Sequence, residues 1–513
     1  MTNGVELGLA AKYAPDLLMD PTSRPDGREY TTGDLRPLQP ALDLIEGVTY
    51  LGAHKKFFHD KELGKGKKKQ TIRVPAIGPI VITSNGEWFP YTLYDLTARG
   101  WQMPTTAAPP ERRRWSEESI EAYLEHPGDS PTPTSIFTAI RDVYDEYIRF
   151  SDPGYLDIMP LYIMLSYVFR AFTAVPYLHF NGMAGSGKSQ NLLLMGAIGF
   201  NATMSSNITS SALFRTVAGW PGLVCADEFE SSSREEMEPI LSVFRSGYKR
   251  GSPAVRTQKD HEDQFSVANF NVFGPKAIAS ITQLEGRLRE RCIVVATRKT
   301  LDKVPAFDDE HTCWQTLRDD LHIFALRHQA PINALALTWT REKRNLLAPN
   351  IENRPWELAF PLVVLAEYID RAQLMPDIIA WLANYFAAAS LQEAALDKTR
   401  LALLTLPTVL REGLGATPDP AFYKLAAIRK AIIERLEEDQ KEKFSSGALA
   451  GILRNYGFPS QRSSGGTVVH MTEDMVRRSF AEQRLEPLEE DKAWYEGTEA
   501  PPAPARPSIW KEE

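Results

Sequence analysis

The spacing of apolar and polar positions changes several times along the chain, and each change predicts a different kind of element. Residues 1 to about 40 are rich in Pro, Gly and Asp and show little periodicity, which predicts irregular structure. From about 41 to 100, runs such as "GVTYLG" and "TIRVPAIGPIVITS" predict β-strands. Between them "KELGKGKKKQ" predicts a basic hairpin turn, either a solvated loop or a nucleic-acid contact, with Lys61, Lys65, Lys67, Lys68 and Lys69.

The middle of the chain changes from linker-like composition to helical and then to mixed patterning. The Pro-rich stretch 103–116 predicts a linker, and the three-and-four spacing of "SIFTAIRDVYDEYIRF" predicts one of the helices that follow it. Between 175 and 300 short apolar runs alternate with helical patterns, as in a parallel sheet with helices between its strands. From about 300 to 412 the pattern is mostly helical.

The C-terminal part shows a second change of pattern. "GATPDPAF" (415–422) predicts a domain boundary, and after it come a helix over roughly 422–440, a short helix closed by Gly457, a β-turn with a strand, and a last helix. This order is typical of a winged helix, which either binds DNA or serves as a protein-binding or structural module. Many acids favour the second reading, and four arginines favour the first: Arg454, Arg462, Arg477 and Arg478.

Composition and charge limit the classes of function. In 513 residues, 43% are hydrophobic and 24% charged, which is ordinary for a globular protein. A net charge of −8 excludes a globally basic coat, so any nucleic-acid contact needs locally concentrated charge. Neither the N-terminus nor the apolar stretch 158–169 has the form of a signal peptide or membrane span, so we expect a cytoplasmic protein without membrane contact. We expect reduced, buried thiols at Cys225, Cys292 and Cys313.

The strongest chemical signal is a glycine-rich turn between a strand and a helix. "PYLHF" reads as a short strand, "GMAGSGKS" as the turn and "SQNLLLMGAIG" as an apolar helix. Backbone N–H groups at such a helix start bind phosphate oxygens. Lys188 would reach the β- and γ-phosphates of ATP, and the Ser189 hydroxyl would bind Mg²⁺. The predicted nucleotide-binding residues are Gly182, Met183, Ala184, Gly185, Ser186, Gly187, Lys188, Ser189 and Gln190.

A second signal follows about 40 residues later, in "GLVCADEFE". A buried strand ending in two carboxylates beside the phosphates predicts that Asp227 positions Mg²⁺ together with Ser189. Glu228 would polarise the attacking water. The adjacent glutamate favours an ATPase over a nucleotide kinase, because hydrolysis needs an oriented water.

A third signal comes from the next two apolar runs. "PKAIAS" reads as a strand whose last residue, Ser280, would touch the water or the γ-phosphate, with Asn271 as an upstream alternative. "RCIVVAT" reads as the last strand. Three arginines lie between the two runs, and one of them inserted across a subunit interface would stabilise transition-state charge; otherwise they are surface arginines. They are Arg287, Arg289 and Arg291.

Together "GMAGSGKS", "LVCADE", "KAIAS" and "RLRERC" resemble the core of AAA+ ATPases. With "ALFR", "SGYKRG" and "FNVFGPKAIAS" the chain is similar to superfamily-3-like replicative helicases of phages, plasmids and integrative elements, of the primase–helicase type. The resemblance covers 150–300 strongly, 301–370 weakly and the first hundred residues not at all. It implies an α/β fold, an AAA+ P-loop core with a parallel sheet and a helical lid, to which the sequence pattern adds a C-terminal winged helix and a β-rich N-terminal domain.

The resemblance also implies a ring-forming homo-oligomer, a hexamer in such proteins, that binds ATP between subunits. A lid arginine would reach the phosphates, and Arg354, before Pro355 at a helix start, fits this role or else a structural salt bridge. A hairpin in "GYKRGSPAVR" would line the pore and hold single-stranded DNA, with its tip at Lys249 and Arg250. Tyr248 would stack on a base, and Arg256 and Lys259 would follow on the hairpin; a solvent hairpin is the alternative.

The predicted domains therefore follow the changes in pattern. They are 1–102, a β-rich N-terminal domain; 103–150, a linker with helices; 151–300, the ATPase core; 301–414, the helical lid; 415–487, the winged-helix-like domain; and 488–513, an acidic Pro-rich tail that is disordered or a docking peptide.

Two functions agree with these patterns. The first is an ATP-hydrolysing DNA helicase or translocase of a mobile-element replication system, working with a separate primase or other replication protein, since no primase motif is present. The second is a non-unwinding AAA+ switch that acts on a protein partner, such as a helicase loader, a transposition regulator or a defence ATPase. Unwinding polarity, the choice between DNA and RNA and the ring size stay open.

Overall fold

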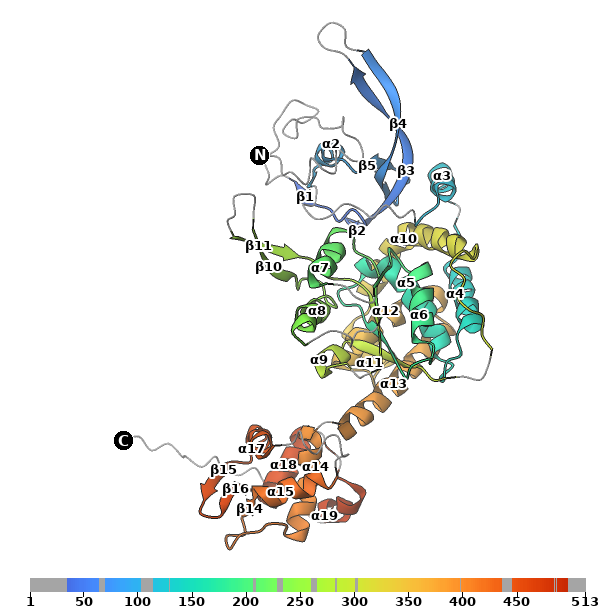
Figure 1. Ribbon diagram of the computed structural model, residues 1–513. Helices are drawn as coiled ribbons and strands as arrows, with labels where there is room; N and C mark the ends of the chain where they lie inside the picture. The colour runs from blue at the N-terminus through green and yellow to red at the C-terminus, as the bar shows by residue number, and fades with distance from the viewer. Residues whose placement is uncertain are drawn as a thin grey trace. The chain divides into compact units, whose positions relative to one another are not determined.

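The computed structural model divides the chain into two compact units, Met1–Ala383 and Asn384–Glu513 (Figure 1). Each unit is described by itself. The structure describes residues 35–63, 70–102, 114–128, 130–205, 209–227, 234–259, 265–281, 284–299, 303–396, 398–435, 445–483, 485 and 487–496.

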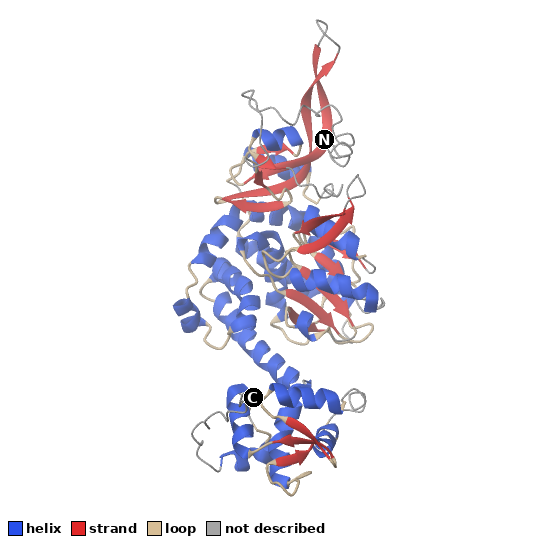
Figure 2. Cartoon of the chain, turned by 90° about the vertical axis from the view of Figure 1, so that its left-hand side faces the viewer, coloured by secondary structure: helices blue, strands red, loops and turns tan. Residues whose placement is uncertain are grey.

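An antiparallel sheet begins the first unit, in the order β2-β3-β4-β5. Its two central strands pair from Tyr50 opposite Thr83 to Leu63 opposite Gln70, far beyond the short outer strands. The outer half is therefore a two-stranded arm, which Figure 2 shows running beyond the other strands of this sheet. The predicted hairpin is confirmed, while residues 64–69 of its turn lie outside the described residues. The strands are β2 (Leu42–Ile45), β3 (Val48–Leu63), β4 (Gln70–Thr83) and β5 (Trp88–Pro90).

Short elements connect this sheet to the rest of the unit. Ser116 caps the helix that follows it, because its hydroxyl accepts a hydrogen bond from the Ser119 amide. Lys55 on β3 forms an ion pair of 2.7 Å with Glu121 on that helix, which ties the base of the arm to it. The connecting elements are β1 (Arg36–Pro37), α2 (Leu93–Ala98), β6 (Trp101–Gln102), α3 (Glu117–Glu125) and α4 (Pro133–Tyr147).

The predicted parallel sheet is present and has five strands in the order β13-β7-β12-β9-β8. Strand β12 comes late in the chain but lies between β7 and β9, and it pairs parallel with both. Because all five strands run in the same direction, all of them end at one edge of the sheet. The strands are β7 (Tyr177–Asn181), β8 (Thr203–Ser205), β9 (Val224–Ala226), β12 (Lys276–Ser280) and β13 (Cys292–Ala296).

Helices pack against this sheet, because its strands are apolar and must be buried. Phe214 and Val217 of α7 share a hydrophobic cluster with Val243 and Phe244 of α8 and with Ile278 of β12. Helix α5 is buried along almost its whole length, as its continuous apolar run requires. The helices are α5 (Tyr155–Val168), α6 (Lys188–Ile198), α7 (Ser210–Gly219) and α8 (Arg234–Ser246), with a 3-10 turn η2 (Phe169–Ala171) after α5.

An antiparallel ribbon of two strands, β10 (Ala254–Lys259) and β11 (Phe265–Phe270), interrupts the chain between α8 and β12. Its root is buried through Ala254 and Phe270, which belong to the same hydrophobic cluster as α7 and α8. On its other face Val255 is 54% exposed and Val267 is 69% exposed. We call these two strands the ribbon. The short helix α9 (Gly286–Arg289) then precedes β13.

Four helices follow the sheet, in agreement with the predicted helical pattern. Helices α10 and α12 contact α4 and α5, so they enclose the apolar helix α5. Near the start of α10, Arg318 donates to the Ala197 carbonyl, and Arg114 donates to the Gly196 and Gly199 carbonyls. These arginines satisfy the last carbonyls of α6, where cations are favoured. The four helices are α10 (Cys313–Leu337), α11 (Arg341–Leu347), α12 (Asn353–Asp370) and α13 (Leu374–Leu396).

The second unit contains helices around a small antiparallel sheet of order β14-β16-β15. Helices and strands alternate as in the predicted winged helix, except that a strand replaces the expected helix at 422–424; the winged-helix assignment itself stays a prediction. The elements are α14 (Lys398–Glu412), β14 (Phe422–Lys424), α15 (Leu425–Ile433), α17 (Ser446–Asn455), β15 (Ser460–Ser463), β16 (Gly466–His470), α18 (Glu473–Gln483), η3 (Glu489–Asp491) and α19 (Lys492–Glu496).

Both predicted limits of this unit need correction. Helix α14, which the pattern assigned to the lid, contributes Leu406 to the same hydrophobic cluster as α15 and α17. The segment after 487 is not all tail, because Asp491 is fully buried and accepts a hydrogen bond of 2.7 Å from Thr408. Arg477 lies over the ring of Trp494, so this arginine supports the unit from within. Residues 497–513 lie outside the described residues.

The length of the helices and the burial of the cysteines bear on two further predictions. Within the described ranges, no helix combines the length and apolarity that crossing a bilayer requires. The three cysteines are free, and Cys225 and Cys292 are buried in the sheet. Burial raises the pKa of Cys225 to about 12 and raises that of Cys292 as well, so both are protonated thiols at neutral pH. The predicted burial is confirmed for these two, whereas Cys313 is only partly buried.

We expect Gly52→Ala to lower the free energy of unfolding by about 1–3 kcal/mol, because overpacking a tight contact costs this much. A methyl group on Gly52 of β3 would lie 2.4 Å from Cη2 of Trp220 and 2.6 Å from the Pro40 carbonyl oxygen. Gly78→Ala on β4 is the matched control, since its methyl group would make an ordinary contact of 3.5 Å with Phe57. Urea denaturation measures both, and equal midpoints would contradict the close approach of β3 to Trp220.

Candidate nucleotide-binding site

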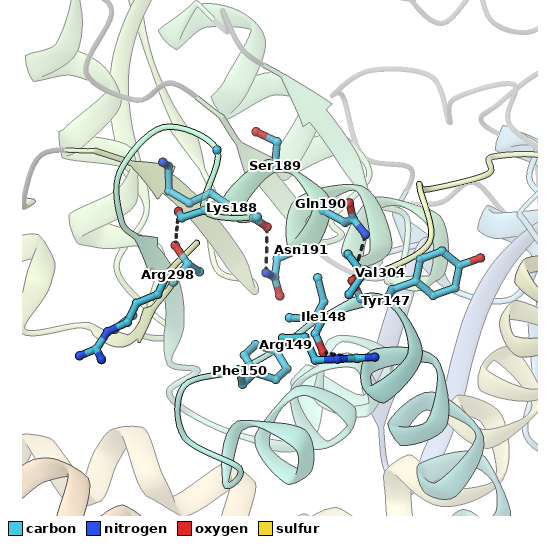
Figure 3. A pocket seen from close by; sticks show the side chains of 15 residues that line it. Tyr147, Ile148, Arg149, Phe150, Lys188, Ser189, Gln190, Asn191, Arg298 and Val304 are labelled. Carbon is cyan, nitrogen blue, oxygen red and sulfur yellow. Dashed lines mark hydrogen bonds between the residues drawn. The ribbon is translucent and has the colours of Figure 1, made fainter. Parts of the chain in front are cut away.

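The glycine loop (Gly182–Gly187) joins β7 to α6 as the sequence predicts. Gly185 and Gly187 have φ of 75° and 89°, a left-handed conformation that glycine alone adopts without strain. The loop ends at the first residues of α6, whose backbone N–H groups have no partner within the helix. Lys188 Nζ donates to the Gly182 and Met183 carbonyls at 2.6 and 3.0 Å, so the amine closes back on the loop (Figure 3).

The end of β13 supports the glycine loop from behind. Thr297 N donates to the Asn181 carbonyl at 2.8 Å, and Thr297 Oγ1 lies 2.7 Å from Ser186 Oγ. A methyl group on Gly182 would lie 2.3 Å from the Thr297 carbonyl oxygen. The first glycine is therefore required by this close approach, while the later glycines are required by backbone conformation.

A cavity of about 430 Å³ lies beside the loop, within the size range of small-ligand sites. Arg149, Lys188 and Arg298 are among its lining residues, so its walls suit a polyanion such as a nucleotide triphosphate. Three segments that no motif marked complete the walls, since the fold alone brings them to the loop (Figure 3). The lining residues are 147–150, 185–191, 296–298 and Val304.

Not every residue predicted to bind the nucleotide lines this cavity. Gly185 to Gln190 do, whereas Gly182, Met183 and Ala184 do not, and Met183 is 76% exposed. The amide of Gln190 donates to the Tyr147 and Pro305 carbonyls at 2.9 Å each, so this side chain connects two walls of the cavity. Its contribution to a ligand would therefore be indirect.

The ends of β9 and β12 lie at the same sheet edge as the glycine loop. Ser280 pairs with Asn181, the last residue before the loop, and Ala226 pairs with Ile278. Asp227 follows Ala226 directly and is half-buried, while Glu228 lies outside the described residues. Asn271, the alternative to Ser280, precedes β12 at the opposite edge and accepts a hydrogen bond from Phe273. The structure therefore favours Ser280 for a position beside the phosphates.

A buried histidine that the sequence reasoning missed holds Ser280. His179 Nε2 lies 2.7 Å from Ser280 Oγ, and His179 Nδ1 is buried with no hydrogen-bond partner. Burial, together with the cation of Arg289, lowers the pKa of His179 to about 4, so the ring is neutral at neutral pH. A proton on Nδ1 would be a buried donor without an acceptor, so the proton belongs on Nε2, which donates to Ser280. The available signal was the position of His179 three residues before Gly182, on the strand that leads to the loop.

The predicted finger arginines lie at the strand-start edge, away from the glycine loop of the same chain. Arg287 is exposed and Arg289 is half-buried. Arg291 is held by the carbonyls of Arg245 and Arg287, so its guanidinium has structural partners. The exposed Arg287 therefore fits the finger role better than Arg291.

Arg354, predicted either to reach the phosphates or to form a structural salt bridge, lies away from the glycine loop of its own chain and beside Glu357. Its guanidinium lies 4.8 Å from the ring centre of Tyr248 and 3.8 Å from a carboxylate oxygen of Glu357. The Tyr248 carbonyl accepts from Val175 N, just before β7 begins, which is the opposite edge from the glycine loop. The intervening strand separates the arginine from that loop.

The predicted position of the hairpin tip is wrong. Tyr248 is only 8% exposed and lies between the guanidinium groups of Arg291 and Arg354, so stacking on a base would require it to leave the core. Lys249 forms an ion pair of 3.0 Å with Glu357, and Arg250 donates to the Arg170 carbonyl.

The turn of the ribbon comes at 260–264, an acidic "DHEDQ" outside the described residues. Arg256 and Lys259 do lie on β10, but their side chains are not described. Nucleic-acid contact by any of the five residues stays a prediction.

Comparisons with known proteins add no family. No family model matches the chain, and no curated protein matches it. Similar solved structures include a full-length MCM homologue from Methanopyrus kandleri, with 10% identity over 66% of this chain and 77% of that chain and a TM-score of 0.32. Another is "SCCmec type IV Cch - active helicase", with 11% identity, 83% and 93% coverage and a TM-score of 0.37. A third is the C-terminal region of NrS-1, with 15% identity, 67% and 76% coverage and a TM-score of 0.29. These TM-scores are too low to support a conclusion about the function of this chain.

We expect His179→Gln to reduce the loss of stability between pH 6.5 and pH 4. The pKa of His179 is about 4 in the folded chain and 6.5 in a free side chain, so the unfolded state binds more protons in this range. Wild-type stability therefore decreases as the pH is lowered, and His179 accounts for up to about 3 kcal/mol of this decrease. Urea denaturation across this range measures the slope, with the exposed His126→Gln as the control for losing a histidine. Equal slopes for wild type and His179→Gln would show that the ring is not held neutral.

Proposed function

We propose that this chain binds and hydrolyses ATP, and that it uses the energy to move along or unwind DNA as a ring. The observation that carries the ATPase part is the strand order. It brings the glycine loop, Asp227 and Ser280 to one edge of the parallel sheet. Residues 185–187 of the loop also line a cavity of about 430 Å³, whereas Asp227 and Ser280 do not line it. A phosphate-binding loop next to an acidic and a polar strand end is the arrangement that phosphoryl transfer needs.

Each side chain then has a role that its position supports. Lys188 would exchange the Gly182 and Met183 carbonyls for phosphate oxygens, because a triphosphate offers its ammonium full negative charges. Ser189 and Asp227 would hold Mg²⁺, which neutralises charge on the phosphates. Glu228 would orient the water, and Ser280 would donate its hydroxyl proton towards the γ-phosphate or that water, since His179 already donates to its oxygen.

The position of the arginines supports a site shared between copies of the chain. A strand of five residues such as β7 is about 16 Å long, so an arginine at the strand-start edge does not reach the loop of its own sheet. Arg287 and Arg289 would instead reach the glycine loop of a neighbouring copy, and Arg354 lies at the same edge. Repetition of this contact around an axis closes into a ring, for which we propose six copies.

The proposal that DNA is the track rests on the two antiparallel projections. The ribbon carries Arg256 and Lys259 and lies in the chain between α8 and β12, two elements whose other ends lie at the nucleotide edge. The β3–β4 arm carries the lysine-rich segment 61–69 at its end. Local positive charge of this kind would allow DNA contact despite a net charge of −8. Replication of a mobile element, a partner primase and a role of the second unit in DNA or protein binding are further parts of this proposal.

One observation favours the alternative, a non-unwinding ATP-driven switch that acts on a protein partner. The ribbon's turn is acidic in sequence rather than basic, with Asp260, Glu262 and Asp263. Acidic residues in the segment between the two strands would repel a phosphate backbone and suit a basic protein surface. The two functions share the ATPase site and differ in what the ribbon contacts.

We expect Glu228→Gln to retain ATP binding and to lose hydrolysis by about 10²–10⁴-fold, the usual effect of removing a general base. Glu230→Gln, two residues later in the same stretch, removes the same charge and is the matched control. Steady-state hydrolysis and binding of a fluorescent ATP analogue measure the two effects. Loss of hydrolysis in both variants, or in neither, would contradict the role of Glu228.

The ATP-bound Glu228→Gln protein on forked DNA is also the sample that tests the ring. Particle images that show a six-fold ring around one strand would support a translocase. A monomer, or an open filament that leaves the DNA uncovered, would favour the protein-directed switch.

We expect a mixture of Lys188→Ala and Arg287→Ala proteins to recover part of the hydrolysis that each variant lacks alone. If the site is shared, some subunit contacts in a mixed ring combine an intact Lys188 with an intact Arg287. Loss of such an arginine alone lowers the rate of hydrolysis by about 10³-fold or more. A mixture of Lys188→Ala and Ser189→Ala is the control, because both changes affect the same loop and no contact is intact. Recovery in both mixtures or in neither would contradict a shared site that uses Arg287.

A further inference from the structure

A fully buried lysine, which the proposed ATPase does not use, begins the central strand β12. Lys276 has no exposed surface, and in the described part of the chain it forms no ion pair with a carboxylate. Its ammonium donates to the carbonyls of Val272 and Gly274 at 3.0 Å each and to that of Gly247 at 3.5 Å. A buried cation is costly unless such partners satisfy it, so this residue needs an explanation.

The surroundings fix this lysine firmly. Nζ lies 4.8 Å from the ring centre of Tyr177 and 5.9 Å from that of Phe244, both of which stabilise a cation. The Tyr162 hydroxyl accepts from the Lys276 amide at 3.1 Å and donates to its carbonyl at 2.8 Å. The backbone and the ammonium of Lys276 are therefore both held in place.

The three carbonyls belong to the two ends of the ribbon. Gly247 follows α8 and leads into β10, whereas Val272 and Gly274 lie between β11 and β12. Gly274 N also donates to the Gly247 carbonyl at 3.1 Å, so both ends of the ribbon meet at the ammonium. A methyl group on Gly247 would lie 2.6 Å from Nζ, so the contact leaves no spare room.

The elements that meet at Lys276 also reach the nucleotide edge at their other ends. Strand β12 runs five residues from Lys276 to Ser280, which His179 orients. Helix α8 starts a few residues after Asp227 and ends just before Gly247. A small displacement of Ser280 or of the acidic strand end would therefore change the geometry at the ammonium, because strands and helices transmit axial shifts as rigid bodies.

We propose that Lys276 is a positioning residue that couples nucleotide occupancy at the Ser280 end of β12 to the orientation of the ribbon. This inference rests on the proposed nucleotide site, and it specifies how that site acts on the part of the chain that contacts the partner. An apolar side chain at 276 would fill the space but would leave the ends of the ribbon without their common bond to the strand.

The test compares the full chain and its Lys276→Met variant by hydrogen exchange of the backbone amides in β10 and β11, with and without a non-hydrolysable ATP analogue. We expect wild type to show an analogue-dependent change in exchange at the ribbon. The variant should lose this change while its affinity for the analogue stays within about threefold of wild type. Ile278→Ala is the matched control, because Ile278 is equally buried on β12 and its apolar side chain cannot donate a hydrogen bond to the three carbonyls. It should lower stability and keep the analogue-dependent change.

Several outcomes would overturn the proposal. They are a normal analogue-dependent change in Lys276→Met, an equal loss in Ile278→Ala, and no change in wild type despite bound analogue. If Lys276→Met does not fold, Gly247→Ala disturbs the same contact from the other side, and retention of the change in that variant would also overturn the coupling. Failure of wild type to bind the analogue would instead contradict the proposed nucleotide site.

Discussion

The parallel pairing of β12 with β7 on one side and β9 on the other is the constraint on which the rest of this structure depends. The glycine loop, Asp227 and Ser280 come from segments up to about a hundred residues apart, and only this strand order brings them to one edge. The same pairing places the starts of the strands, with Arg287 and Arg289, at the opposite edge. One edge of the sheet is thus suited to bind phosphate. In the proposed ring, the opposite edge would supply positive charge to a second copy of the chain.

Buried polar groups accumulate along β7 and β12, where apolar residues would give a simpler core. His179 with Ser280 and Lys276 with its three carbonyls are both enclosed by the sheet and the helices that cover it. Such groups stay in a core only when hydrogen bonds satisfy them, and a satisfied network fixes one arrangement of its members. In this chain the two groups lie at opposite ends of β12, one beside the glycine loop and the other at the ends of the ribbon.

The largest difference from the sequence-based predictions concerns "GYKRGSPAVR". Its charges suggested an exposed turn, but Tyr248 packs against two guanidinium groups, Lys249 pairs with Glu357, and Arg250 donates to the Arg170 carbonyl. A glycine-rich basic stretch has the same local pattern whether it forms a hairpin tip or the root of a longer hairpin. The distinction depends on which strands pair, and strand pairing is a long-range property that local composition does not contain.

The sequence by itself determined the glycine loop, the acidic and polar strand ends, the alternation of strands and helices, and the hairpin at the lysine-rich turn, because each depends on residue types within a few positions. Only the tertiary structure decided that Ser280 rather than Asn271 lies at the edge with the glycine loop, and that Arg354 lies far from it. The tertiary structure also decided that His179 contacts Ser280 and that Lys276 contacts three carbonyls. It also showed that residues 398–412 and 488–496 belong to the second unit. These features depend on burial and on contacts between distant segments, and the energy of a buried polar or charged group is set by the partners that the fold supplies rather than by its neighbours in sequence.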